Sequence, residues 1–486
     1  MTTPTSSTAT ATGSLPQGKL TGSLGAGAIV FMVVAAAAPL TVIGGATPLG
    51  FLLGNGAGFP SLYLVAALIL VLFSVGLSAM TRQVPRPGAF YTYVDYGLGR
   101  APGMAAAYLA LLTYTSVQAA VYGYIGELLR LTLTPLGMPD MPWWLYTLVV
   151  VGLVAVLGYR HIDLSAKVLG ILLIAEIAIV VVLVAAVVLT GGPEGLSLTP
   201  FEPATVASGA PGIGLMLAMA AFIGFESTVV FRDEAKNPDR TIPKATYIAV
   251  IGIGALYALV SWALVMAWGP TKVTTAAAAD PAGMLITTTL NYLGPIGAGT
   301  VNVLLLTSLF AAALSFHNVL TRYKHAMAGT GVLHASLATI HTRHLAPSTS
   351  SLVQSITAAA IVVLFALSGL DPILEVFTWM AGVSTLAISV LMALTSAAVI
   401  VYFRRTATDR RIWHTLIAPL LGLVGLGITA AIVALNFPLL VGELDPTGTP
   451  IFGPTSTTLV SLTAVALIAG LVQARLTHHR KTQARP

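Results

Sequence analysis

The chain contains no cysteine and very little charge. The absence of cysteine excludes disulfide bonds, thiolate metal sites and cysteine nucleophiles. Asp, Glu, Lys and Arg together make up 8% of the 486 residues, against roughly 25% in a typical soluble domain. So few charges cannot cover the water-exposed surface of a protein this long. The composition therefore excludes a soluble enzyme, a disordered chain and a nucleic-acid-binding protein.

Apolar sequence takes the place of the missing charge. Hydrophobic residues make up 56% of the chain, and the mean hydropathy is +0.90. Uncharged apolar runs such as 62–80 and 177–190 are continuous rather than alternating. Continuous runs are typical of membrane-spanning helices, whereas membrane strands alternate. The sequence predicts an all-α polytopic membrane protein, multi-pass in the cell membrane, with the lipid bilayer around it.

Twelve segments are apolar and long enough to be membrane spans. The predicted spans are residues 24–53, 58–81, 101–130, 142–159, 165–190, 209–232, 244–268, 289–322, 349–368, 372–402, 413–437 and 455–475.

The distribution of Lys and Arg supports this span count. With the N-terminus inside, all 23 of these residues except Arg130 and Lys272 fall in cytoplasmic loops or tails. Cytoplasmic loops are enriched in Lys and Arg, and a wrong count would scramble the pattern. Both termini are therefore predicted to be cytoplasmic, and the sequence pI of about 9.5 reflects topology, with no nucleic-acid partner.

Three carboxylates lie inside predicted spans: Glu127, Glu176 and Glu226. A charge at mid-membrane costs roughly 2.5–3.5 kcal/mol on insertion scales, so such residues are functional candidates by default. Glu226 follows Gly224 closely, which suggests an unwound segment in span six; the alternative is a glutamate that only bonds a neighbouring helix. Glu127 lies near the outer end of span three, where we expect an interfacial carboxylate in water.

Span one contains a similar interruption. Pro39 lies midway along it, and Gly44 and Gly45 follow. Proline removes a helical hydrogen bond and clashes with the preceding turn; the alternative to a break is a simple proline kink. Interrupted helices in corresponding halves of a chain are the best sequence pointer to a transporter site. Spans one and six are five spans apart. Because five is odd, the second unit of five spans has the opposite orientation in the membrane to the first.

Three sequence motifs resemble one known family. Residues 222–226 read Phe-Ile-Gly-Phe-Glu, and residues 232–245 read Arg-Asp-Glu-Ala-Lys-Asn-Pro-Asp-Arg-Thr-Ile-Pro-Lys-Ala. Together they closely resemble the sixth-span signature of the amino acid–polyamine–organocation (APC) permeases. Residues 86–93 and 321–329 look like the loops of that family before span three and after span eight. The resemblance covers about residues 20–475.

The resemblance implies a fold and an activity. It implies a LeuT-like 5+5 inverted repeat with two further C-terminal helices, and amino acids or related amines bound between spans one and six. It implies secondary active transport, usually coupled to protons or run as exchange; a sodium-coupled symporter and a non-transporting membrane sensor are alternatives. Three scattered glutamates do not form a clustered catalytic set, and the sequence has no metal-binding or nucleotide-binding motif, so we expect no enzyme activity, cofactor or metal. Homodimers occur in the family.

The family fold divides the chain into five predicted parts. They are a disordered cytoplasmic tail (1–22), the first inverted repeat (23–208), the second inverted repeat (209–402), spans eleven and twelve (403–475) and a basic cytoplasmic tail (476–486).

The same resemblance selects the predicted substrate-binding residues. They are Ala36, Ala37, Ala38, Leu40, Thr41, Phe222, Gly224, Phe225, Glu226 and Ser227. One departure concerns Ala36 to Ala38, which stand where the family usually carries a glycine-rich stretch. The altered stretch leaves open a substrate that is not a standard α-amino acid.

Two glutamates and two hydroxyls are predicted to couple transport to an ion. Some family members carry a lysine, thought to stand in for a sodium ion, near the place of Glu176. A carboxyl group buried away from water favours its neutral form, so Glu176 and Glu226 are predicted to carry protons. The alternative for Glu176 is a permanently neutral, hydrogen-bonded acid. Thr307 and Ser308 match span-eight hydroxyls that bind the ion in sodium-coupled relatives.

Overall fold

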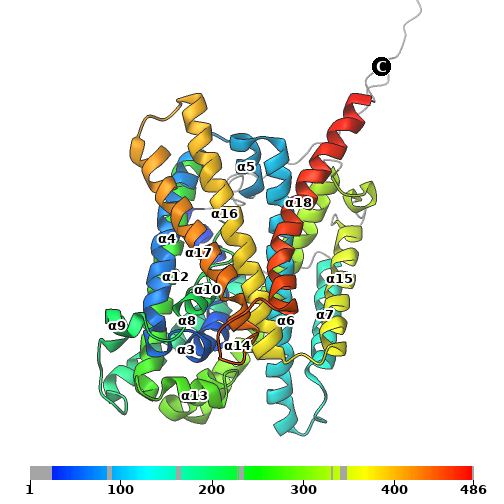
Figure 1. Ribbon diagram of the computed structural model, residues 1–486. Helices are drawn as coiled ribbons and strands as arrows, with labels where there is room; N and C mark the ends of the chain where they lie inside the picture. Colours follow the sequence, from blue (N-terminus) through cyan, green and yellow to red (C-terminus); the bar gives the residue numbers. More distant parts are fainter. Residues whose placement is uncertain are drawn as a thin grey trace, which may run out of the picture.

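The computed structural model describes residues 25–84, 90–159, 166–226, 228, 235–329, 332–339 and 347–483. These residues form one bundle of helices, most of which run along a common direction (Figure 1). An isolated β-bridge joins Leu444 and Pro450.

The helices have the following bounds. They are α1 (Ala26–Ala36), α2 (Pro39–Thr41), the π-helix η1 (Val42–Ala46), α3 (Thr47–Leu53), the 3₁₀-helix η2 (Gly56–Gly58), α4 (Phe59–Thr81), α5 (Phe90–Leu98), α6 (Arg100–Leu133), η3 (Thr134–Leu136), α7 (Trp143–Tyr159), α8 (Ala166–Thr190), η4 (Thr199–Phe201), α9 (Pro203–Val206), α10 (Pro211–Ala220), α12 (Pro238–Trp268), α13 (Val273–Ala279), α14 (Met284–Gly329), η6 (Ala335–Ala338), α15 (Ser348–Leu367), η7 (Pro372–Phe377), α16 (Thr378–Thr406), η8 (Trp413–Ile417), α17 (Ala418–Leu440) and α18 (Pro454–Gln483).

Nine helical segments in the described residues are long and apolar enough to cross a membrane. The other three predicted spans coincide with shorter apolar helices, Pro39–Leu53, Trp143–Tyr159 and Pro211–Ala220. Two of these short helices belong to spans one and six, the spans that the sequence predicts to be broken.

The helix of span eight extends beyond its predicted limits at both ends. The sequence predicts 289–322, whereas α14 extends from Met284 to Gly329. A positive φ of 72° at Gly294 kinks the helix near its start. The helix therefore continues on both sides of the apolar stretch that the hydropathy pattern identifies.

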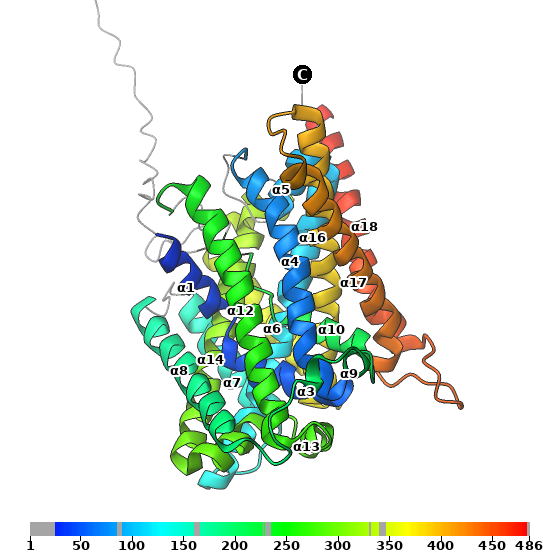
Figure 2. The same ribbon diagram turned by 90° about the vertical axis from the view of Figure 1, so that its left-hand side faces the viewer.

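Connecting segments gather at two opposite ends of the bundle. α5, the α16–α17 connection and the C-terminal end of α18 lie at one end, whereas α9 and α13 lie at the other (Figures 1 and 2). This grouping agrees with the predicted alternation of loops.

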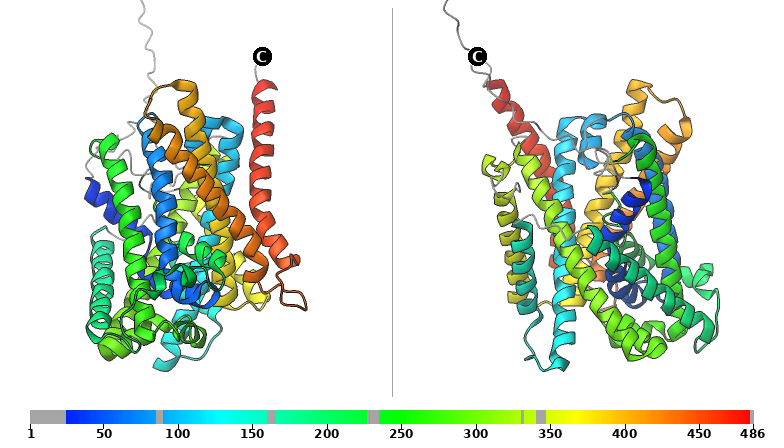
Figure 3. Two further views of the ribbon diagram at one scale, coloured as in Figure 1. Left: turned by 60° about the vertical axis from the view of Figure 1, so that its left-hand side comes forward. Right: turned by 180° about the vertical axis from the view of Figure 1, so that it is seen from behind.

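The outer helices carry apolar side chains on their outward faces. Leu189 and Ile174 on α8 are 87% and 62% exposed. Helix α18, red in Figure 3, stands along one side of the bundle with little of its surface covered. Contiguous exposed apolar surface of this kind suits lipid rather than water, so the chain is a polytopic membrane protein.

Candidate functional site

The helix of span one is broken directly before Pro39. α1 ends at Ala36, and Ala38 has a left-handed backbone with φ 46° and ψ 70°. This conformation costs roughly 1–2 kcal/mol for a residue other than glycine. Pro39 then begins α2, where its missing N–H leaves no donor unpaired. The break lies where the sequence predicts it.

The helix of span six is also broken. α10 ends at Ala220, and residues 221–226 follow as turns rather than helix. Gly224 has φ 115°, which side-chain-bearing residues rarely adopt. The predicted unwound segment is therefore present. Ser227 and residues 229–234 lie outside the described residues.

Glu226 joins the break in span six to span three. Its side chain is buried, with 3% exposed. The hydroxyl of Tyr114 on α6 donates to Glu226 Oε1 at 2.5 Å, and the backbone N–H of Gly224 donates to Oε2 at 2.8 Å. Charge-assisted bonds of this length are strong, so the carboxylate holds the turn in place.

Glu176 on α8 joins spans one, five and eight. The backbone N–H of Leu40 and the hydroxyl of Ser308 both donate to Glu176 Oε2, at 3.4 and 3.2 Å. Thr41 in turn donates to Ser308 at 3.4 Å. The predicted ion-site residue Ser308 therefore lies with Glu176. Thr307 instead donates to Leu304 O of its own helix.

Tyr257 on α12 is a contact that the sequence analysis missed. Its hydroxyl donates to the carbonyl of Ala37 at 3.4 Å, at the break itself. A tyrosine in an apolar span gives no sequence signal that separates this role from packing.

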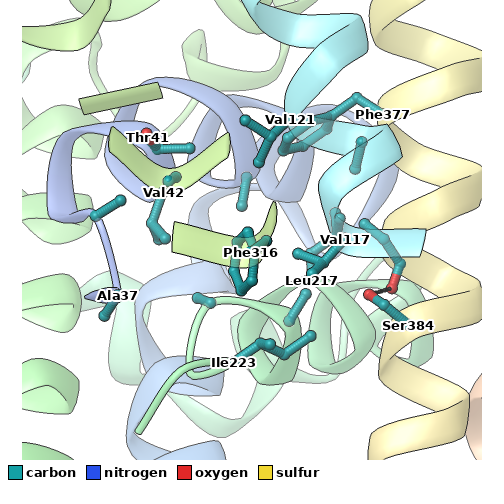
Figure 4. Close-up of a pocket in the computed structure, with 17 residues that line it drawn as sticks. Ala37, Thr41, Val42, Val117, Val121, Leu217, Ile223, Phe316, Phe377 and Ser384 are labelled. Carbon is teal, nitrogen blue, oxygen red and sulfur yellow. Dashed lines mark hydrogen bonds between the residues drawn. The ribbon is translucent and has the colours of Figure 1, made fainter. Parts of the chain in front are cut away.

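A small cavity lies between the two breaks. Its volume is about 60 Å³, and a buried water needs roughly 10–15 Å³ of such space. Figure 4 shows side chains from spans one, three, six, eight and ten pointing into it. The lining residues are Ala37, Ala38, Thr41, Val42, Ala46, Val117, Ala120, Val121, Leu217, Ala220, Ala221, Ile223, Ala312, Phe316, Phe377, Ala381 and Ser384. None of the described lining side chains is ionisable, and only Thr41 and Ser384 carry polar groups.

The predicted residues of span one mostly reach this cavity. Ala37, Ala38 and Thr41 line it. Leu40 is fully buried and its amide faces Glu176. Ala36 ends α1; its side chain is outside the described part of the structure.

The predicted aromatic residues of span six lie elsewhere. Phe222 packs edge-on against Tyr257, with ring centroids 6.1 Å apart. Phe225 packs against Phe73 and Phe90, each at 6.2 Å. Ala221 and Ile223 line the cavity in their place, because neighbouring residues of the turn face opposite sides. Whether Phe222, Gly224, Phe225 and Glu226 bind substrate stays a prediction.

The walls from spans three, eight and ten were not predicted. Val117, Val121, Phe316, Phe377 and Ser384 all face the cavity. Four of them are ordinary apolar residues, whose sequence pattern is the same whether they face a neighbouring helix or a ligand.

Glu127 differs from the expected carboxylate in water. It is bonded by Arg130 at 2.7 Å, and only 13% of its side chain is exposed. Arg130 also contacts Asp140 at 3.1 Å. The prediction did not take account of Arg130, which follows Glu127 by three residues and therefore lies on the same helix face. Within the described residues, no group of three or more His, Asp or Glu side chains could hold a metal ion.

Two broken helices beside a small apolar cavity define a membrane protein with a site for a small solute. Comparison with known proteins agrees with this class. The profile of the amino acid permease family matches residues 5–461. The chain therefore belongs to the amino acid permease family, as the APC resemblance predicts.

The chain is similar to several individual permeases. It is 26% identical to the branched-chain amino acid permease BcaP of Lactococcus lactis subsp. cremoris (strain MG1363) over 43% of this chain and 49% of that relative. It is 23% identical to the aspartate-proton symporter of Bacillus subtilis (strain 168) over 40% of this chain and 38% of that relative. It is 26% identical to an uncharacterized transporter of Mycobacterium tuberculosis (strain ATCC 25618 / H37Rv) over 76% of this chain and 78% of that relative. The chain thus matches about half the length of the first relative.

Proposed function

We propose that this protein is a proton-coupled secondary transporter of an amino acid with an apolar side chain. The apolar cavity between the two broken helices carries this proposal. The chain would cross the membrane twelve times, with both termini cytoplasmic. Residues 23–208 and 209–402 would form a LeuT-like 5+5 inverted repeat, with spans eleven and twelve packed beside it.

The lining of the cavity determines the substrate class. A charged side chain placed there would lose its hydration without gaining a partner, at a cost of several kcal/mol. The described walls offer Val117, Leu217 and Phe316 but no ionisable group. An aliphatic amino acid fits this surface better than aspartate, lysine or a polyamine. The branched-chain permease among its relatives supports the same substrate class.

The breaks supply polar backbone for the substrate's ammonium and carboxylate groups. Half-helix N-termini present N–H groups to an anion, and unwound carbonyls suit a cation. The backbone around Ala37, Ala38 and Thr41 borders the cavity on one side, and the turn at Ile223 borders it on another. The substrate's charged groups would face these segments, and its side chain would face α6 and α16.

Glu176 and Glu226 would couple transport to protons. Each buried carboxylate bonds the backbone at or next to one of the two breaks. Protonation removes the charge that these N–H groups stabilise and turns one oxygen into a donor. Both breaks can therefore respond to proton binding, which is what alternating access driven by a proton gradient requires.

Uptake by proteoliposomes of the purified protein tests this function. We expect an inward proton gradient to drive accumulation of leucine, isoleucine or valine, but not of aspartate or lysine. Glu226→Gln keeps the hydrogen-bonding shape but cannot take up a proton. We expect it to reduce proton-driven uptake by roughly 10²-fold, at the low end for a positioned acid–base group. Proton-driven uptake of aspartate would refute the proposed substrate class. Normal uptake by Glu226→Gln would refute the proposed role of Glu226 in proton coupling.

A further inference from the structure

A row of three tyrosines leads from Glu226 toward one end of the bundle. Tyr114 lies on α6, Tyr323 on α14 and Tyr91 on α5. The rings of Tyr114 and Tyr323 are 5.5 Å apart between centroids, and those of Tyr323 and Tyr91 are 5.6 Å apart. The first of these tyrosines donates to the Glu226 carboxylate. Four side chains from four segments of the chain thus form one continuous row.

Exposure to solvent increases along this row. Glu226 and Tyr114 are buried, and Tyr323 is 9% exposed. Tyr91 is partly exposed, and Asp95, one turn further along α5, is exposed. Figure 1 shows α5 at the same end of the bundle as the C-terminal end of α18. One end of the row therefore meets water, and the other end reaches the break in span six.

The row runs separately from the substrate cavity. Phe316 packs against the Tyr114 ring at 6.3 Å, and the same Phe316 lines the cavity. An apolar ring therefore stands between the cavity and the tyrosines. A proton could reach Glu226 along the row without crossing the space that holds the substrate.

We propose that Tyr91, Tyr323 and Tyr114 relay protons between water at the α5 end and Glu226. The inference rests on the proposed role of Glu226 as a proton carrier. A phenol hydroxyl both donates and accepts a hydrogen bond, so each tyrosine can receive one proton as it gives another away. None of them has to remain charged.

The proton balance of one transfer is simple. Tyr114 passes its hydroxyl proton to Glu226, and Tyr323 passes its proton to Tyr114. Tyr91, whose ring contacts that of Tyr323, passes its proton to Tyr323 through a water molecule between the two hydroxyls. Water at the α5 end, beside the Asp95 carboxylate, returns a proton to Tyr91. Glu226 ends neutral and every tyrosine ends as it began. The reverse sequence discharges Glu226.

The charged and titratable groups around the row are few. Within the described residues, Tyr114 interacts with Glu226 and Tyr323, and Tyr323 interacts with Tyr91 and Glu226. Tyr91 interacts with Asp95. Among the described residues, Asp95 is thus the one acidic group besides Glu226 that interacts with the three tyrosines, and it lies at the solvent-exposed end of the row.

Tyr323→Phe is the direct test because it keeps the ring and removes the hydroxyl. Tyr292→Phe on the same helix is the matched control, since in the described part of the chain its hydroxyl donates to a backbone oxygen, Ala267 O, at 3.1 Å. Proton-driven uptake and substrate exchange are measured in the same proteoliposomes. We expect Tyr323→Phe to slow proton-driven uptake at least roughly tenfold, as loss of a proton-transfer group does. Exchange, which needs no net proton transfer, should change less than about twofold, and the control should match wild type in both.

The outcomes separate the relay from the proposed function. Unchanged proton-driven uptake in Tyr323→Phe, with a proton-driven wild type, overturns the relay alone. Equal loss of uptake and exchange would mean that the hydroxyl supports the fold, and this also overturns the relay. Tyr91→Phe, at the exposed end, repeats the test where folding is least at risk. A wild type that is not driven by protons removes the proposed coupling and the relay together.

Discussion

Glu176 and Glu226 are both buried glutamates, but their hydrogen bonds differ. Glu226 accepts from a tyrosine hydroxyl and from Gly224, an amide within its own turn. Glu176 accepts from Leu40 in span one and Ser308 in span eight, both far along the chain from it. Losing the charge on Glu226 therefore weakens the turn of span six and its contact with span three, whereas losing the charge on Glu176 weakens contacts among spans one, five and eight.

Glu176→Gln should flatten the pH dependence of uptake. Glutamine resembles the protonated acid at every pH, so external acidification no longer changes the state of this side chain. We expect the maximal proton-driven rate to fall about tenfold, which corresponds to ~1.4 kcal/mol in the barrier. Glu127→Gln is the control, since Glu127 is paired with Arg130 away from both breaks. An unaltered pH profile in Glu176→Gln, or a requirement for sodium, would contradict proton coupling through this residue.

Sequence reasoning at this scale found the charged residues and missed the apolar ones. A carboxylate inside a span is costly, so Glu176 and Glu226 are conspicuous in the sequence. Phe316 and Val117 are not conspicuous, because an apolar residue beside a cavity and one beside another helix obey the same pattern. Phe222 and Phe225 were predicted beside the substrate because they flank Gly224, but flanking a turn does not fix which way a side chain points.

Hydrogen bonds join the C-terminal end of α3, in span one, to the segment that leads into α10, in span six. The N–H of Ala210 donates to Gly54 O at 3.0 Å, and the Asn55 amide donates to Val206 O at 3.0 Å. A Cβ on Gly54 would lie 2.9 Å from Cα of Gly214 and 2.5 Å from Gly50 O. Contact this close requires glycine and leaves no room for sliding. Helices α3 and α10 should therefore move as one body.

Gly54→Ala should force this contact apart. Overpacking a tight contact costs typically 1–3 kcal/mol, so we expect a lower melting temperature in detergent and slower uptake. Gly252→Ala is the matched control, because a Cβ there meets nothing within 4 Å. It should leave stability unchanged or raise it by up to ~1 kcal/mol, since alanine is the better helix former. Equal stability of the two variants would show that the backbone around Gly54 can shift to accept a Cβ at little cost, which would contradict the prediction.

The arrangement of the whole molecule can be tested because the chain has no cysteine. Thr447 and Thr408 are exposed and lie in the connections before α18 and α17. We expect a membrane-impermeant maleimide to label Thr447→Cys on intact cells, and to label Thr408→Cys only after permeabilisation. The cysteine-free parent gives the background. The opposite pattern would invert the proposed orientation.

The overall fold was the most predictable level. Hydropathy located each of the nine segments in the described residues that are long and apolar enough to cross a membrane, because lipid imposes the same requirement on each span. Helix limits were less accurate, as α14 shows, since hydropathy follows the apolar stretch and not the helix itself. The pairing of α3 with α10 was not predicted at all, because it depends on glycine backbones whose neighbours are distant in sequence.

The small size of the cavity sets a condition on affinity. About 60 Å³ is well below the roughly 150 Å³ of an engineered cavity that takes up benzene, so an aliphatic amino acid requires a wider form of the protein. If only a fraction of molecules is in that form, the apparent dissociation constant is the intrinsic one divided by that fraction. Substitutions far from the cavity that favour the wider form should then tighten binding without touching the substrate.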